Sequence, residues 1–121
     1  GADFYGASFE EDANFKYAEF DQAPVFTQAT FGEEANFKYA EFPKRTSFAG
    51  AIFEEEANFK YAEFPGGASF AEARFMDLAN FKYTKFSNPL DMKNVKFEGS
   101  EDFKYTQVDG HSFTSFLLKS Q

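Results

Sequence analysis

The sequence of residues 13–20 is ANFKYAEF, and the same eight residues return at 35–42 and 57–64. A fourth copy, at 79–86, reads ANFKYTKF. Each copy starts 22 residues after the one before it. Self-similarity at a fixed period indicates a repeat architecture, in which equivalent residues of successive repeats stack on one another.

Phenylalanine recurs through most of the chain in alternating steps of five and six residues. A helix with this spacing would send successive Phe side chains to nearly opposite sides, and a continuous strand would flip faces at every five-residue step. The chain must therefore turn between one Phe and the next, so that all of them point toward a common axis. The predicted core anchors are Phe15, Phe20, Phe26, Phe31, Phe37, Phe42, Phe48, Phe53, Phe59, Phe64, Phe70, Phe75, Phe81 and Phe86. The series begins at Phe4 and Phe9 and continues through Met92, Phe97, Phe103 and Val108.

The residue two positions before most anchors is Ala. Positions two apart in an extended segment face the same side, so Ala and Phe share the interior. The residues that follow Phe are polar, Gly or Pro, which is typical of corners, as in Pro65-Gly66-Gly67.

This A-x-F-x-x unit resembles the pentapeptide-repeat family, and the resemblance covers Ala2 to about Val108. It is most similar to Phe-rich members in which every second pentapeptide carries one extra residue. The resemblance implies a right-handed quadrilateral β-helix with four pentapeptides per coil. We therefore expect an all-β solenoid of about five 22-residue coils over residues 1–111, and a short C-terminal cap or tail over residues 112–121. Five coils at strand spacing would span roughly 24 Å.

Stacking at the repeat period predicts columns of identical residues on the surface. Stacked Tyr and hydrogen-bonded Asn14, Asn36, Asn58 and Asn80 would support one another, and the Glu column of the next face would offset repulsion between Lys side chains. The column of Lys and Tyr is either a regular binding strip or a self-supporting solvated face. Its residues are Lys16, Tyr17, Lys38, Tyr39, Lys60, Tyr61, Lys82 and Tyr83.

A second corner is acidic. It comprises Glu10, Glu11, Asp12, Glu33, Glu34, Glu54, Glu55, Glu56, Asp77 and Glu98. A solvated edge that aids solubility explains these residues, and a cation site or a surface that imitates DNA are the alternatives. The ridge breaks at Met76 and Leu78, and no calcium-loop motif is present.

Composition argues against several classes of function. The net charge of −8 disfavours direct binding to nucleic acid or to an anionic membrane surface. There is no Cys for a thiolate metal site, a single His at 111, and no phosphate-binding or nucleophile motif. We expect no enzyme activity, cofactor or metal. Without a bilayer-length apolar run or a signal peptide, a cytoplasmic location is favoured.

The two ends of a solenoid expose core and strand edges unless they are capped. Phe113, Phe116 and Leu117 have the spacing of one helical face, which favours a short helical or irregular cap, whereas Phe113 and Leu118 equally continue a five-residue step from Val108. At the other end, we expect the first coil to begin at Ala2-Asp3-Phe4 without a cap. We expect an end-to-end homodimer, with Phe113, Phe116, Leu117 and Leu118 as the favoured contact.

The sequence therefore predicts a non-catalytic repeat scaffold that binds an unknown protein partner. The alternative is implied by the family resemblance, because certain pentapeptide-repeat proteins regulate type II topoisomerases by imitating duplex DNA. Against this alternative, a duplex of ~24 Å would carry about 14 charges, and the Lys column interrupts one flank.

Overall fold

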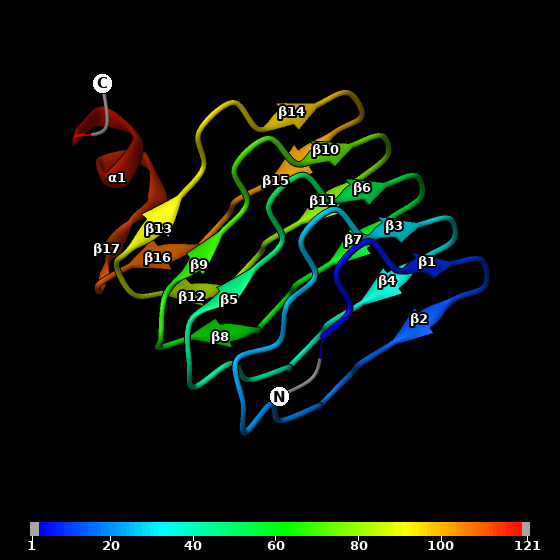
Figure 1. The fold of residues 1–121 in the computed structure, drawn as a ribbon. Helices are drawn as coiled ribbons and strands as arrows, with labels where there is room; N and C mark the ends of the chain where they lie inside the picture. The colour runs from blue at the N-terminus through cyan, green and yellow to red at the C-terminus, as the bar shows by residue number, and fades with distance from the viewer. Residues whose placement is uncertain (1–2, 120–121) are drawn as a thin grey trace.

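The computed structural model of the chain describes residues 3–119. Its backbone winds into a solenoid of stacked coils, which appear as successive loops in Figure 1. Strands of neighbouring coils pair in parallel, with Ala13 opposite Ala35 and Ala35 opposite Ala57. The pairing register therefore equals the sequence period, and the predicted 22-residue coil is confirmed.

Four sheets form the faces of the solenoid, and each coil contributes one short parallel strand or bridge to each face. The first face contains β1 (Ser8–Phe9), β3 (Thr30–Phe31), β6 (Ile52–Phe53), β10 (Arg74–Phe75) and β14 (Lys96–Phe97). The second face contains β2 (Ala13–Asn14), β4 (Ala35–Asn36), β7 (Ala57–Asn58), β11 (Ala79–Asn80) and β15 (Glu101–Asp102).

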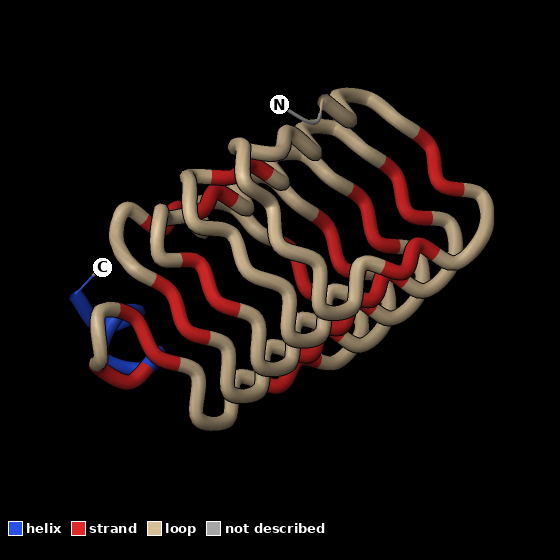
Figure 2. Tube along the Cα trace, turned by 90° about the horizontal axis from the view of Figure 1, so that it is seen from below, coloured by secondary structure: helices blue, strands red, loops and turns tan. Residues whose placement is uncertain are grey.

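The remaining faces are completed by isolated bridges in the first coils, such as Glu19 with Glu41. The third face contains β8 (Glu63–Phe64), β12 (Lys85–Phe86), β16 (Gln107–Val108) and β17 (His111–Ser112). The fourth face contains β5 (Thr46–Ser47), β9 (Ala68–Ser69) and β13 (Leu90–Asp91). Figure 2 shows the strands of successive coils aligned in rows.

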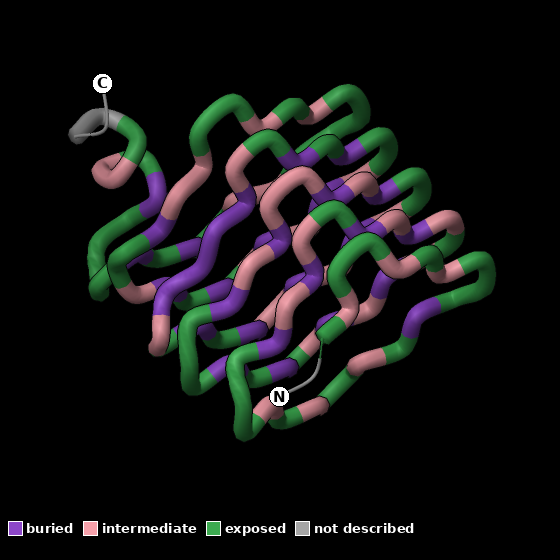
Figure 3. The backbone as a smooth tube through the Cα atoms, in the orientation of Figure 1, coloured by how far each residue is buried: buried purple, intermediate pink, exposed green. Residues whose placement is uncertain are grey.

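The core is a set of stacked Phe columns, as the sequence predicts. In one column, Phe37, Phe59 and Phe81 stack with ring centroids 5.0 Å apart and nearly parallel planes. Many ring pairs within one coil meet edge to face, as do Phe48 and Phe59 with planes at 88°. Both arrangements suit the quadrupole of the aromatic ring, so one side chain type can fill the interior in two directions. Figure 3 shows this buried residue pattern repeating from coil to coil.

The small residues beside the Phe side chains are buried as expected. Ala35, Ala57 and Ala79 are completely buried. Thr takes the place of Ala at position 84, where its hydroxyl donates a 2.6 Å hydrogen bond to the carbonyl oxygen of Phe59. Thr46 does the same to the carbonyl oxygen of Pro24. A buried hydroxyl is tolerated here because each one has an acceptor.

The C-terminal end is closed by a hairpin and a helix. Strand β17 pairs antiparallel with β16, and α1 (Phe113–Lys119) follows directly. Phe113 stacks on Phe103 with centroids 4.2 Å apart. The helical interpretation of this segment is therefore confirmed, and the continued five-residue step is not what the chain adopts.

Candidate interaction surfaces

The axis of the solenoid offers no space for a ligand. Phe side chains from Phe26 to Phe81 are at most 1% exposed and form one continuous cluster. Among the described residues, no three His, Cys, Asp or Glu side chains lie close enough to hold a metal ion. No helix within residues 3–119 has the length and apolar character needed to cross a membrane.

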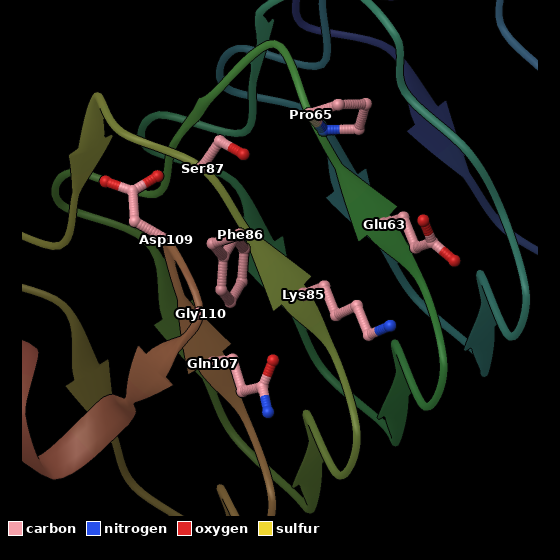
Figure 4. A pocket seen from close by; sticks show the side chains of 8 residues that line it. All are labelled: Glu63, Pro65, Lys85, Phe86, Ser87, Gln107, Asp109 and Gly110. Atoms are coloured by element: carbon pink, nitrogen blue, oxygen red, sulfur yellow. The ribbon is translucent and has the colours of Figure 1, made fainter.

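A surface depression lies beside the third face (Figure 4). Glu63, Lys85 and Gln107 stand on neighbouring strands and point to the same side of the sheet. The hydroxyl of Ser87 borders this depression, and none of the residues that line the depression is a His.

The repeated Lys-Tyr pair occupies a tight turn between the second and third faces. The backbone N–H of Ala18 donates to the carbonyl oxygen of Phe15 at 3.0 Å, and Tyr17 has a φ of 64°. The Oδ1 atom of Asn14 accepts a hydrogen bond from the N–H of Lys16 at 3.0 Å, which braces the turn. The same turn is built at Tyr39, Tyr61, Tyr83 and Tyr105.

The role of the Asn column differs from the expected ladder. Asn36, Asn58 and Asn80 each use Oδ1 to accept from the backbone N–H two residues further on. No hydrogen bond joins one Asn side chain to the next in the part of the chain that the structure describes. The local acceptor geometry of an Asx turn therefore prevails over the link between coils.

The expected Tyr column is present. Ring centroids from Tyr17 through Tyr83 lie 4.9 Å apart, with interplanar angles of 3–7°. Tyr105 continues the column at 4.8 Å with a tilt of 21°. The end members Tyr17 and Tyr105 are 62% and 61% exposed. The rings therefore cover one another's faces and leave their edges and hydroxyls to the solvent.

The Lys side chains of the same turns lie against the Tyr rings. The Nζ atoms of Lys16, Lys38, Lys60 and Lys82 are 5.3–5.9 Å from the centroid of the next residue's ring. We expected the Glu column of the third face to offset the charge of these Lys side chains. Among the described residues, however, no carboxylate lies within 4.0 Å of their ammonium groups. The ion pair that the structure forms within this distance joins Arg74 and Glu98. The turn itself separates the two columns, because Lys projects from the corner and Glu from the next face.

The acidic residues follow the strands of the first face and precede those of the second, so they lie at the corner between these two faces. Their columns are interrupted by Gly32, Met76 and Leu78. Glu98 is already engaged by Arg74 at 3.0 Å. Burial raises the pKa of the Glu56 carboxyl above its ordinary value, and the negative charges of Glu34 and Asp77 raise this pKa further.

Replacement of Glu56 by Gln is expected to raise the melting temperature near neutral pH. The folded protein holds the Glu56 proton more tightly than the unfolded chain, so ionisation of Glu56 costs stability. This cost is present at neutral pH and disappears as the pH falls through the raised pKa toward the ordinary value of 4.5. Thermal melts of Glu56→Gln at several pH values should show a gain that shrinks on acidification. Glu55→Gln, at an exposed position, is the control; a gain for Glu56→Gln that does not change with pH would contradict the assignment.

The two ends differ. Phe113 is buried, Phe116 packs partly buried against the core, and Leu117 is 43% exposed; the side chain of Leu118 lies outside the described residues. Two of the four residues expected at a dimer contact therefore pack on their own stack. At the first coil, Phe4, Phe9, Phe15 and Phe20 are partly buried, and each stacks on the coil that follows it.

Most surface columns could be located from the sequence, but the buried Thr hydroxyls and the unpaired state of the Lys column could not. Both depend on contacts between coils. The sequence does carry one sign of the buried hydroxyls, because Thr84 and Thr106 occupy the position that is Ala in the first three coils.

Comparison with protein families agrees with this architecture. A family model described as pentapeptide repeats (9 copies) matches residues 4–50 and 37–85. Neither the comparison with curated proteins nor that with solved structures gives a match. The family match covers more than half of the sequence, and the stacked four-sided coils have the Phe spacing that such repeats require. The chain belongs to the pentapeptide-repeat family.

Proposed function

We propose that this protein is a non-catalytic repeat scaffold that binds protein partners through its outer columns. The observation that carries the proposal is the uninterrupted aromatic core. Rings from Phe15 to Phe113 stack along one column at 4.2–5.0 Å, which leaves no cleft along the axis, within the described residues, in which a substrate could be enclosed. Chemistry on an enclosed substrate needs such a cleft, whereas binding needs only a surface.

The construction of the coils supports a binding role. Every outward column is held by a backbone ladder between coils, such as the 2.7 Å bond from the N–H of Phe37 to the carbonyl oxygen of Asn58. Side chains at a given position therefore have fixed neighbours and a fixed spacing. A pre-organised surface loses little entropy when a partner docks, so affinity can be gained without a pocket.

The alternative function is a regulator of a type II topoisomerase that imitates duplex DNA. Such a surface requires closely spaced negative charge along the length of the solenoid. Here the acidic corner is broken by Gly32, Met76 and Leu78, and five Lys line the adjoining corner. These observations favour the scaffold.

The proposal is tested by comparing the protein with a variant that keeps the core and changes the surface. In this variant the exposed Lys, Tyr and Glu of the outward columns become Ser or Asn. A partner retained from cell extract by the original protein and lost by the variant would support the scaffold. Retention that does not depend on these columns would contradict it. Inhibition of gyrase supercoiling at micromolar protein would favour the DNA-imitating alternative instead.

End-to-end dimerisation stays a prediction. Analytical ultracentrifugation across a concentration series measures it directly. A monomer that persists at hundreds of micromolar would contradict pairing at either end. A dimer that survives removal of residues 113–121 would place the contact at the first coil, where Phe4 and its neighbours are partly exposed.

A further inference from the structure

We infer that the column of Lys and Tyr is the docking face of this scaffold and that its occupant is a narrow, acidic protein segment in extended conformation, lying along the solenoid axis. The inference rests on the proposed function and names both the surface and the chemistry of the partner. Four features of the described residues carry it.

The first feature is a comparison of two equivalent turns in every coil. The turn between the fourth and first faces has the same hydrogen bond as the Lys-Tyr turn, from the N–H of Ala7 to the carbonyl oxygen of Phe4 at 2.9 Å. It also has a positive φ at its third residue. In successive coils that residue is Gly6, Gln28, Gly50, Glu72 and Asn94.

The turn between the fourth and first faces therefore accepts several residue types, and Gly or Asn suits its left-handed backbone best. At the Lys-Tyr turn, the residue with positive φ is Tyr in all five coils, and Lys precedes it in each case. A bulky residue with positive φ is unfavourable. Turn geometry does not account for five identical Lys-Tyr pairs, because the turn between the fourth and first faces has the same geometry and uses a different residue in almost every coil.

The second feature is unneutralised positive charge. Five of the 12 basic residues of this acidic chain stand in one column, at Lys16, Lys38, Lys60, Lys82 and Lys104. None of them is within 4.0 Å of a carboxylate among the described residues. Neighbouring ammonium groups at strand spacing repel one another, and an anionic partner would relieve this repulsion.

The third feature is the way the Tyr rings are presented. Because rings such as Tyr39 and Tyr61 stack at 4.9 Å and 3°, their faces are covered and their edges point outward. The edge of an aromatic ring is the positive part of its quadrupole, and the hydroxyl is a hydrogen-bond donor. Both favour carboxylates. The arrangement offers no exposed ring face between coils on which a nucleic-acid base could stack.

The fourth feature is the shape of the positive strip. Over the first three coils it is one column wide, with the acidic corner on one side and Glu19, Glu41 and Glu63 on the other. In the last two coils Lys85 and Gln107 take the place of these Glu residues. A broad polyanion such as a duplex would meet these carboxylates, whereas a single extended chain would not. Four coil spacings give a strip of about 20 Å, which an extended peptide of about seven residues can cover.

Binding of a fluorescently labelled hepta-glutamate peptide tests the inference. Fluorescence anisotropy at low ionic strength should show binding by the unmodified protein that weakens as salt is added. The variant Lys38→Gln, Lys60→Gln, Lys82→Gln should bind at least about tenfold more weakly, because three adjacent charges are lost from the strip. The matched control is Lys44→Gln, Lys93→Gln, Lys96→Gln, which changes the net charge of −8 by the same amount at exposed positions elsewhere and should bind as the original does. Circular dichroism melts check that both variants fold.

Substitution of the three strip residues by Arg keeps the charge and should keep binding. Equal weakening of the two Gln variants, or no binding by the original protein, would overturn the inference. Binding of inorganic polyphosphate that depends on the strip, without binding of hepta-glutamate, would overturn the class of partner. Self-association that is lost only in the strip variant would assign the strip to a second copy of this chain. If the peptide fails while partner capture still depends on the outward columns, the scaffold proposal stands and this inference does not.

Discussion

Replacement of Phe59 by Ala is expected to lower the free energy of unfolding by about 3–5 kcal/mol. Phe59 is fully buried at mid-stack and lies 5.0 Å from the ring centroids of both Phe37 and Phe81. Phe48 and Phe70 meet it edge to face. Those neighbours are held by backbone ladders at fixed spacing, so they cannot collapse into the hole that the ring leaves. Urea unfolding followed by far-ultraviolet circular dichroism measures the loss.

Two controls accompany this variant. Lys60→Ala changes the adjacent residue in the same turn and should cost well under about 1 kcal/mol, because a half-exposed cation in a like-charged column contributes little. Phe4→Ala removes the same side chain from the first coil, where it is partly exposed, and should cost less than Phe59→Ala. Equal losses from Phe59→Ala and Lys60→Ala would contradict the inward direction of the Phe side chains.

Replacement of Gly67 by Ala is expected to destabilise the protein by about 3 kcal/mol or more, as the sum of strain and overpacking. Gly67 has a φ of +88°, which L side chains rarely adopt. A Cβ atom there would lie 2.6 Å from the carbonyl oxygen of Pro89 in the next coil. That oxygen accepts the hydrogen bond from Ala68 at 3.0 Å, so it cannot move away without weakening the ladder of the fourth face.

Gly6→Ala separates the two contributions. Gly6 also has a positive φ, of +66°, but a Cβ atom there meets nothing within 4 Å. Its replacement should cost about 1–2 kcal/mol from backbone strain alone. Chemical denaturation of both variants measures the difference. A cost at Gly67 no larger than that at Gly6 would show that the coils can shift apart at this corner.

The core illustrates what could be predicted from residues alone. Alternating steps of five and six residues are incompatible with one face of a helix or a strand, so a chain that buries every Phe has to turn after each one. The same argument places Ala35 and Ala57 inside, and both are fully buried. These predictions hold because they depend only on spacing along the chain and on the need to bury apolar surface.

The candidate site was predictable only in part. The Tyr column follows directly from stacking at the repeat period, and the structure confirms it. The pairing of Lys with Glu does not follow, because a separation of three residues spans a turn here and leads to a different face. The Asn side chains satisfy their own turns for a similar reason: the N–H of Lys38 lies 3.0 Å from the Oδ1 of Asn36 and needs no second coil.

The sequence by itself determined the period, the inward Phe and Ala, and the outward columns, since each of these depends on periodic spacing within the chain. Only the tertiary structure decided which neighbours those columns meet. The close approach of Gly67 to Pro89 and the stacking of Phe113 on the Phe103 ring arise where separate coils or segments pack together. The period shows which positions stack, but the closeness of these contacts is set by the closing of the turns and by the space that remains between coils.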